Sequence, residues 1–331
     1  MTDRADMLPP PPSDRRGWRS WELHVPVFDR DVMDQVIREV VAPCAAEISG
    51  GGTVRWFYLR YWQRGPHIRV RMRDLPDTDA RTVQRDFSRR LATVNSAVPR
   101  HRWLTPAAYR TYAAPLARAG ELGRSLSVSD LVAPGVRHGH YEPEYSRYGG
   151  REAMDDAEVS FRDSSELAVG LLARRPGQAA RCGLGLFAAA GLFRLMTDTP
   201  ADTADVLNSL WAMWRRWTGG EESERGTVAG AATADHSPSG LIAALSQEVG
   251  TEVAALRRNG TAERLLQGEL PPPLQGWARS LTDTLRQRPT GDTGAVLASH
   301  LHMLSNRIGL STRDEMRNLA MLTLLFADGT R

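Results

Sequence analysis

The sequence contains no lysine, so arginine supplies all 42 of its basic residues, against 39 acidic ones. The formal net charge is only +3, and the arginines are spread along the chain among acidic residues without forming a basic block. Proteins that bind along a nucleic-acid backbone usually concentrate positive charge on one surface. The charge distribution therefore argues against nucleic-acid binding.

Cysteine and long apolar runs are also scarce. The two cysteines, Cys44 and Cys182, lie in separate helical patterns without metal-ligand spacing, which argues against a disulfide framework or a zinc knuckle. No apolar run approaches the roughly 20 residues that span a bilayer, and the N-terminus lacks the order of a signal peptide. We therefore expect a cytoplasmic protein that does not act at a membrane.

The chain is long enough to bury a sizeable core, with 331 residues of which 41% are hydrophobic. Residues 1–16 include four consecutive prolines and little to bury, which predicts a disordered arm. Residues 17–331 are expected to form one α+β domain. Its sheet-containing half is predicted over residues 17–150 and its helical half over residues 151–331.

Helical and strand periodicities alternate in the first half and give the order β-α-β-β-α. The predicted strands are residues 21–28, 56–62, 67–73 and, further along, 108–113. The predicted helices of this half are residues 31–47 and 77–94. Residues 135–150 are rich in glycine, histidine and tyrosine, and a long loop of this kind is often functional.

The second half reads as a series of helices separated by glycine or proline. The predicted helices are residues 157–173, 178–197, 202–217, 240–258, 274–288, 293–307 and 312–327. Between residues 219 and 240, small and polar residues predict a mobile loop.

One predicted hairpin carries the most informative motif. In the stretch HIRVRMR, Arg69, Arg71 and Arg73 alternate with apolar residues and so share one face of the sheet. Three guanidiniums on one face repel each other, so we expect an anionic or carbonyl-rich partner against them. On the preceding strand, Tyr58 or Trp62 could stack on a ring of such a partner, although packing is the commoner role of strand aromatics.

Two further motifs carry polar and titratable groups. Residues 141–150 read YEPEYSRYGG, and residues 299–307 read SHLHMLSNR. Taken singly, each motif has an ordinary structural explanation, as a stacked aromatic loop or as a helix with a core histidine. Arg307 could complete an anion-facing cluster or form a salt bridge to Glu142 or Asp155.

The histidine pairs do not predict a metal site. Residues two apart on a helix point about 200° away from each other, so His300 and His302 cannot bind one ion together. His138 and His140 could share a strand face, but no third ligand follows at a suitable spacing. We expect neither a metal nor a cofactor.

As a set, the motifs resemble the C-terminal elimination domain of lantibiotic dehydratases, a family also called thiopeptide-type bacteriocin biosynthesis proteins. The resemblance extends from Trp18 to about Ala327. It includes, in the same order, the stretches WFYLRYW, GPHIRVR, EPEYSRYGG and SHLHMLSNR.

The resemblance implies action on a ribosomally made precursor peptide and allows an association with other biosynthetic enzymes. One expected activity is that of a thiopeptide pyridine synthase, which joins two dehydroalanines of a linear azole-containing peptide in a formal [4+2] cycloaddition. Loss of water and of the leader peptide then gives a nitrogen heterocycle within a macrocycle. The alternatives are a standalone protein that eliminates glutamate from glutamylated Ser or Thr, and a noncatalytic precursor-binding member.

The resemblance also implies roles for individual residues. Arg69, Arg71 and Arg147 would hold the reacting carbonyl, and His302 would carry the proton. The remaining residues expected to contact the substrate are Arg73, His67, Tyr58, Trp62, Glu142, Glu144, Tyr148, Ser299, Asn306 and Arg307. Among them, Glu142 or Glu144 is a weaker candidate for the base. We expect all these groups to surround one cleft.

Overall fold

The structure is a computed structural model that describes residues 9–49, 54–119, 126–197, 202–203, 206–207, 210–211, 238–287 and 292–328. The chain divides into two compact units, each built from several segments. The first unit comprises Met1–Ala114, Val128–Glu144 and Ala157–Arg175, and the second comprises Pro115–Ser127, Tyr145–Asp156 and Pro176–Arg331. The arginine strand therefore belongs to the first unit, and His302 to the second.

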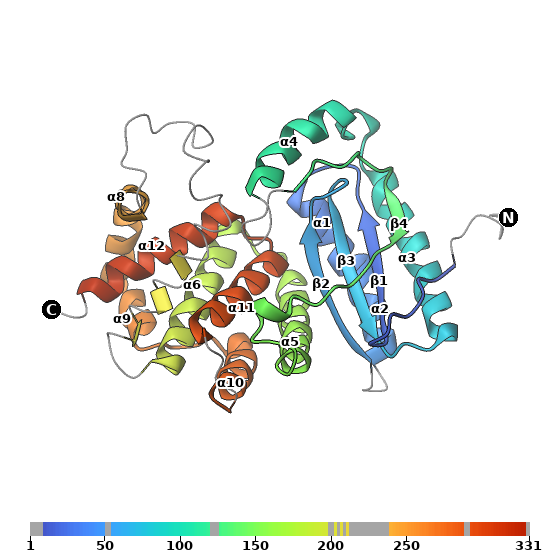
Figure 1. The fold of residues 1–331 in the computed structure, drawn as a ribbon. Helices are drawn as coiled ribbons and strands as arrows, with labels where there is room; N and C mark the ends of the chain where they lie inside the picture. Colours follow the sequence, from blue (N-terminus) through green and yellow to red (C-terminus); the bar gives the residue numbers. More distant parts are fainter. Residues whose placement is uncertain are drawn as a thin grey trace. The chain divides into compact units, whose positions relative to one another are not determined.

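The first unit is built on a four-stranded antiparallel sheet (Figure 1). In the order β2-β3-β1-β4, its strands are Arg55–Tyr61, His67–Arg73, Trp18–His24 and Gly135–His138. The predicted hairpin is β2 and β3, joined through Gly65, whose φ of 115° is a conformation that glycine adopts without strain. β4 lies within the stretch predicted as a loop, because its four residues are too few to show a periodic pattern.

Helices pack against one face of this sheet. α1 (Arg30–Val36) and α2 (Ala42–Ser49) are joined by a π-helical segment over Ile37–Val41, and α3 spans Asp77–Ala97. From β1, Trp21 inserts its indole toward α3, where it donates a 2.8 Å hydrogen bond to Gln84 and contacts Phe87 edge-on. The buried residues of α3 recur at intervals of three and four, as the helical pattern predicts.

The predicted strand over residues 108–113 is wrong, because this segment lies in α4 (Pro106–Ala119). Tyr109 and Ala113, four residues apart, are both buried, which is the helical spacing. Pro106 occupies the first turn, and the Thr105 hydroxyl accepts a hydrogen bond from the backbone N–H of Ala108. The short pattern of residues 108–113 fits both the strand period and the helix period. The proline and the threonine cap at the start of the segment favour the helix.

The other face of the sheet carries the three arginines and an aromatic cluster. Trp18 contacts Phe57 and Tyr141 edge-on, with ring centroids 5.1 and 5.3 Å apart. α5 (Met154–Leu172) adds Phe161, whose ring centroid lies 5.3 Å from that of Phe57. This cluster therefore joins the sheet, the loop before α5 and α5 itself.

Residues 9–16 of the predicted arm contact other segments of the first unit. Arg19 donates to the carbonyl of Pro11, and the carbonyl of Pro9 lies 2.6 Å from Nε2 of His138. Arg16 forms a 2.6 Å ion pair with the buried carboxylate of Glu158. Residues 1–8 lie outside the described residues.

The second unit is helical, which together with the sheet confirms the predicted α+β class. Its helices include α6 (Gln178–Met196), α8 (Pro238–Arg258), α9 (Thr261–Leu266), α10 (Pro272–Gln287), α11 (Thr293–Ile308) and α12 (Thr312–Asp328). Within the predicted helix 202–217, the described residues up to 211 are helical. The predicted loop 219–240 lies outside the described residues, except for its last three residues, which begin α8.

α6 is the most apolar helix of the second unit, and it contacts α9, α10, α11 and α12 (Figure 1). By length and composition alone α6 could cross a membrane, and 44% of its apolar window is buried inside the protein. A Cβ added at Gly191 would lie 2.2 Å from the Leu270 side chain, so glycine is needed there for the close approach. These contacts with four other helices place α6 in the core of this unit.

α11 and α12 form a helical hairpin. α11 ends at Gly309, whose φ of 78° suits a glycine C-cap, and Arg181 from α6 donates to the carbonyl of Ile308. α12 begins after Ser311, which exchanges hydrogen bonds with Asp314 in a capping arrangement. This short connection brings residues at similar distances from Gly309 to face each other on the two helices.

Candidate functional site

β3 presents Arg69, Arg71 and Arg73 on one face of the sheet, as the alternation predicts. Antiparallel pairing sets Arg69 opposite Glu22 and Arg71 opposite Ser20 on β1. Residues opposite each other in such a ladder point to the same side. The arginines are therefore on the face away from α3.

Arg71 is the most deeply placed of the three, with only 8% of its surface exposed. Its guanidinium carbon lies 4.4 Å from the ring centroid of Tyr141 and 5.4 Å from that of Phe57. Burial, with a smaller effect of the neighbouring Arg69 charge, lowers the pKa of Arg71 to about 10. The group stays cationic at neutral pH, and the aromatic rings supply attraction that water would otherwise provide.

Arg69 is held from two sides. Its guanidinium carbon lies 3.5 Å from the ring centroid of Tyr61, its Nε donates to Nε2 of His67 over 3.3 Å, and Nε is 3.7 Å from Oε1 of Glu22. Burial alone would raise the pKa of Glu22, but the hydrogen bond from His24 and the electrostatic interactions with His67 and Arg69 lower it to about 2. The carboxylate is therefore ionised and balances the Arg69 charge.

His67 lies beneath Arg69 and is fully buried. Its Nδ1 is 2.9 Å from the carbonyl of Gly65, which only an N–H can satisfy, so Nε2 is the accepting nitrogen toward Arg69. Burial, and then the charges of His24 and Arg69, lower the pKa of His67 to about 3. His67 is thus a neutral support for Arg69.

The same residues have the composition of a metal site. Among the described residues, Glu22, His24 and His67 bring ligand-type atoms within 4.8 Å of one another. The guanidinium of Arg69 is already within hydrogen-bond distance of His67 and within ion-pair distance of Glu22. It supplies the positive charge that a metal ion would otherwise bring to these ligand atoms, so we assign the cluster to holding Arg69.

Arg73 takes part in a buried ion-pair network. Its Nη1 lies 3.4 Å from Oε2 of Glu158, which also receives Arg16 and a 2.9 Å hydrogen bond from the hydroxyl of Tyr141. The Glu158 side chain is completely buried. Sequence reasoning missed this carboxylate, because a glutamate in the first turns of a helix resembles a solvated residue.

The two aromatic candidates lie in different environments. Tyr58 pairs with Val70 in the β2–β3 ladder, so it points to the face opposite the arginines, and its side chain is buried. Trp62 follows β2, is half-buried and stacks on Tyr61 at a centroid distance of 6.0 Å. Of these two residues, the position of Trp62 is the one compatible with contact to a ligand.

The motif over residues 141–150 is divided between the two units. Tyr141 is buried, and Glu142 and Glu144 are exposed; all three belong to the first unit. The charge of Glu144 acts on the Arg71 guanidinium. Arg147, at the end of the 3-10 turn Tyr145–Arg147, belongs to the second unit.

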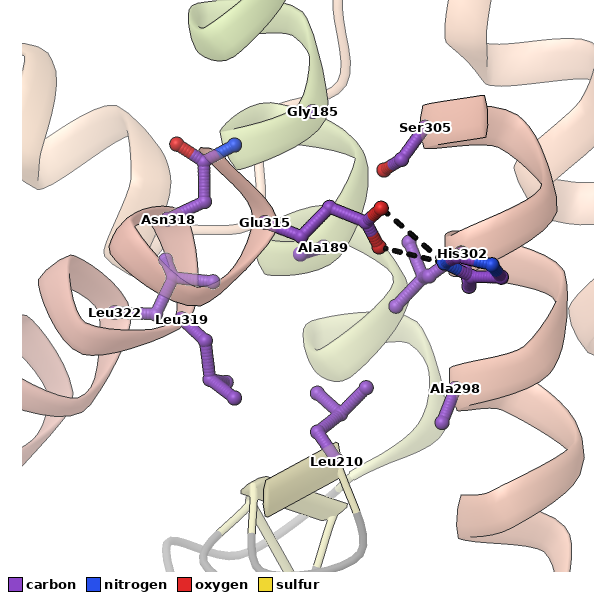
Figure 2. A pocket seen from close by; sticks show the side chains of 11 residues that line it. Gly185, Ala189, Leu210, Ala298, His302, Ser305, Glu315, Asn318, Leu319 and Leu322 are labelled. Atoms are coloured by element: carbon purple, nitrogen blue, oxygen red, sulfur yellow. Dashed lines mark hydrogen bonds and ion pairs between the residues drawn. The ribbon is translucent and has the colours of Figure 1, made fainter. Parts of the chain in front are cut away.

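In the second unit, His302 faces a carboxylate that the sequence analysis did not identify. Nδ1 of His302 lies 3.1 and 3.2 Å from the two carboxylate oxygens of Glu315 on α12, as Figure 2 shows. His302 precedes Gly309 by seven residues and Glu315 follows it by six, so the geometry of a helical hairpin is the signal that could have found this partner.

Arginine charges act on this pair. Burial, followed by the charges of Arg147 and Arg307, lowers the pKa of His302 well below its ordinary value. Burial raises the pKa of Glu315 well above its ordinary value, while the charge of Arg147 opposes this shift. The charges of Arg147 and Arg307 therefore both act on His302.

The neighbours of His302 in the motif lie in different surroundings. Ser299 donates to the carbonyl of Ala295 one turn earlier, and His300 is buried with its ring 5.1 Å from that of Tyr148. Burial lowers the pKa of His300 to about 3, so this imidazole is neutral. Asn306 is half-buried on the same helix.

A small cavity of about 40 Å³ opens beside His302 and Glu315 (Figure 2). Its lining combines four polar residues with small and apolar ones from α6, α11, α12 and residue 210. The lining residues are Gly185, Ala189, Leu210, Ala298, Leu301, His302, Ser305, Glu315, Asn318, Leu319 and Leu322. A space of this size beside polar groups can hold a water molecule.

Comparison with known proteins identifies the class. Residues 18–325 match the family described as "Lantibiotic biosynthesis dehydratase C-term". The chain therefore belongs to this family, whose enzymes act in the biosynthesis of ribosomally made, modified peptides. Among curated proteins, none matches the chain.

Three solved structures are similar to the chain. Pyridine synthase TbtD from thiomuracin biosynthesis has a TM-score of 0.68 and 16% identity, covering 95% of this chain and 99% of that chain. TsrL has a TM-score of 0.60 and 16% identity, with 95% of each chain covered. The tRNA-dependent lantibiotic dehydratase MibB from Microbispora sp. 107891 has a TM-score of 0.50 and 20% identity, covering 96% of this chain and 29% of that chain. At these identities, the likenesses establish the fold.

Proposed function

We propose that this protein is a thiopeptide pyridine synthase. Its substrate would be a linear, azole-containing precursor peptide with two dehydroalanines, which it would join by a formal [4+2] cycloaddition with loss of water and of the leader peptide. The observation that carries the proposal is the fold: the likeness to TbtD is stronger than that to the dehydratase, with TM-scores of 0.68 and 0.50. A cytoplasmic location and chemistry without a cofactor are parts of the same proposal.

The arginine face suits the first requirement of this reaction. One dehydroalanine must react as an aza-diene, in which the neighbouring amide carbonyl takes its iminol form. Donors that are fixed in advance around the carbonyl oxygen stabilise this form. Arg71, held over Tyr141, and Arg69, held by Glu22 and His67, are cationic donors whose geometry is set before any substrate binds.

His302 suits the second requirement, which is proton transfer. Formation of the iminol and loss of water both move a proton, and an imidazole that is neutral at the working pH can accept one and return it. Arg147 acts on the same group through its charge. We propose that holding the two alkenes of the peptide in a reactive pose supplies much of the rate.

Two other functions predict different behaviour. A glutamate-eliminating protein would use the same arginines and histidine to stabilise the enolate that forms when an α-proton is removed. A noncatalytic precursor-binding protein would need the arginines but no proton carrier. The cavity and the carboxylate beside His302 favour a catalyst over a binding module.

One assay separates the three functions. The purified protein is incubated with a linear azole-containing peptide bearing two dehydroalanines, and in parallel with a glutamylated peptide. A pyridine synthase gives a macrocycle and releases the leader as an amide, which mass spectrometry detects together with the loss of water. Loss of one glutamate per modified serine would instead identify a glutamate-eliminating protein. Binding without turnover of either peptide would identify a noncatalytic precursor-binding protein.

A further inference from the structure

The pair His302–Glu315 links two helices through side chains that are mostly shielded from solvent. The side chains of His302 and Glu315 are 19% and 9% exposed, and both line the cavity described above. Figure 2 shows the Glu315 carboxylate pointing from α12 at the ring of His302 on α11. Because Nδ1 is almost equally distant from both carboxylate oxygens, the carboxyl group can meet the ring nitrogen with either oxygen.

The surroundings shift the proton affinities of the two groups in opposite directions. An ordinary imidazole holds a proton about two pKa units more strongly than an ordinary carboxylate. Here burial lowers the pKa of His302 and raises that of Glu315, so both shifts oppose this ordinary order. Because Nδ1 also lies within hydrogen-bond distance of both carboxylate oxygens, the two groups titrate as a coupled pair.

Charged groups on three structural elements act electrostatically on the pair. Arg147 acts from the 3-10 turn before α5, Arg307 from α11 and Asp314 from α12. From α6, the residues lining the cavity are Gly185 and Ala189, which carry no charge. The positive charges of the two arginines stabilise a pair with a net negative charge. They therefore favour the ionised form of the Glu315 carboxyl group.

We propose that Glu315 is a positioning residue that holds Nδ1 of His302 and exchanges a proton with it, so that Nε2 is the nitrogen that meets the peptide. This inference rests on the proposed function and deepens it. When Nε2 takes a proton from the peptide, the Nδ1 proton passes to the Glu315 carboxylate. Both transfers reverse when Nε2 returns a proton to the departing hydroxyl, which leaves as water, and the pair regains its initial protons.

The substitution Glu315→Gln tests this assignment, because the amide keeps the size of the side chain but cannot take up the proton. We expect kcat to fall about 100-fold with little change in KM. We also expect one ionisation to disappear from the pH profile of kcat. Glu248→Gln is the matched control, since Glu248 on α8 pairs with Arg313 and Arg317 of α12 and does not line the cavity. Unchanged kcat and pH profile in Glu315→Gln would overturn the proposal.

A second measurement does not depend on turnover. With ¹⁵N-labelled histidine, the His302 signals are assigned by their loss in His302→Asn, and their titration is followed in the wild-type protein. Coupling to Glu315 predicts two titration steps and a tautomer that changes in Glu315→Gln. A single titration step of His302 in the wild-type protein would refute the pair, and this result does not depend on whether Glu315→Gln folds.

The two measurements also separate this inference from the proposed function. Activity on neither peptide, together with a coupled titration, would contradict the pyridine synthase and leave the pair standing. Pyridine formation that is insensitive to Glu315→Gln would do the reverse.

Discussion

Glu22 and Arg69 face each other across the β1–β3 ladder, with Oε1 of the carboxylate 3.7 Å from Nε of the guanidinium. The same carboxylate lies 3.3 Å from Nε2 of His24. One glutamate thus orients a proposed catalytic arginine and helps to hold the strands beneath it. Stability and activity should therefore both respond to Glu22.

The pH dependence of stability follows from the pKa of Glu22, which is lowered to about 2 in the folded protein. A carboxyl group whose folded pKa is depressed contributes stability above its unfolded pKa of about 4.5 and loses it as the pH falls toward the folded value. We expect Glu22→Gln to reduce the free energy of unfolding at pH 7 by at most about 3 kcal/mol. In urea unfolding measured from pH 7 to 3, the difference from the wild type should stay constant down to about pH 5 and then shrink. A constant difference down to pH 3 would contradict the lowered pKa.

The proposed role of the arginine face predicts a strong effect of guanidinium geometry on turnover. Arg71 stacks on Tyr141, and lysine cannot reproduce a planar stacked donor, so Arg71→Lys should lower kcat about 100-fold despite keeping the charge. Arg69→Lys should behave similarly. Arg81→Ala on the exposed side of α3 is the control, and its kcat should match that of the wild type. Full activity of both lysine variants would mean that charge alone suffices.

Glu158 predicts an effect on stability. Its buried carboxylate receives Arg16, Arg73 and the hydroxyl of Tyr141, so Glu158→Gln leaves partly buried cations without their counter-charge. We expect a loss of about 2–4 kcal/mol in the free energy of unfolding, measured by chemical denaturation. Glu166→Gln on the same helix is half-exposed and should change the free energy by less than about 0.5 kcal/mol. Equal effects of the two variants would remove the special role of the buried network.

The sequence was sufficient for much of the arginine face but not for its supports. Alternation in HIRVRMR places three arginines on one face, because the period of a strand is fixed. It does not reveal that Glu22 lies opposite Arg69, since strand pairing between distant segments sets the register. Alternation also predicts which residues of β2 share a face with Tyr58. It does not predict which face of the sheet the helices cover, because that depends on tertiary packing.

Local patterns were weakest where a segment is short. Residues 108–113 fit a strand and a helix equally well over six positions, and the first turn of α4 beginning at Pro106 decided the outcome. β4, with four residues, has too little pattern to be recognised and is defined by its pairing with β1. Glu315 was within reach of sequence reasoning, because a hairpin centred on Gly309 places it opposite His302.

The last prediction concerns whether the two clusters act in the same chemical step. Arg71→Ala and His302→Ala should each lower kcat/KM about 100-fold or more, while circular dichroism and thermal unfolding show a folded protein. If both groups stabilise one transition state, the double variant should lose much less than the product of the two single effects, because residues that act as a unit are not additive. Multiplicative losses would instead indicate that the arginine face and the His302 cluster serve separate steps, with the arginines binding the peptide and the histidine acting on it afterwards.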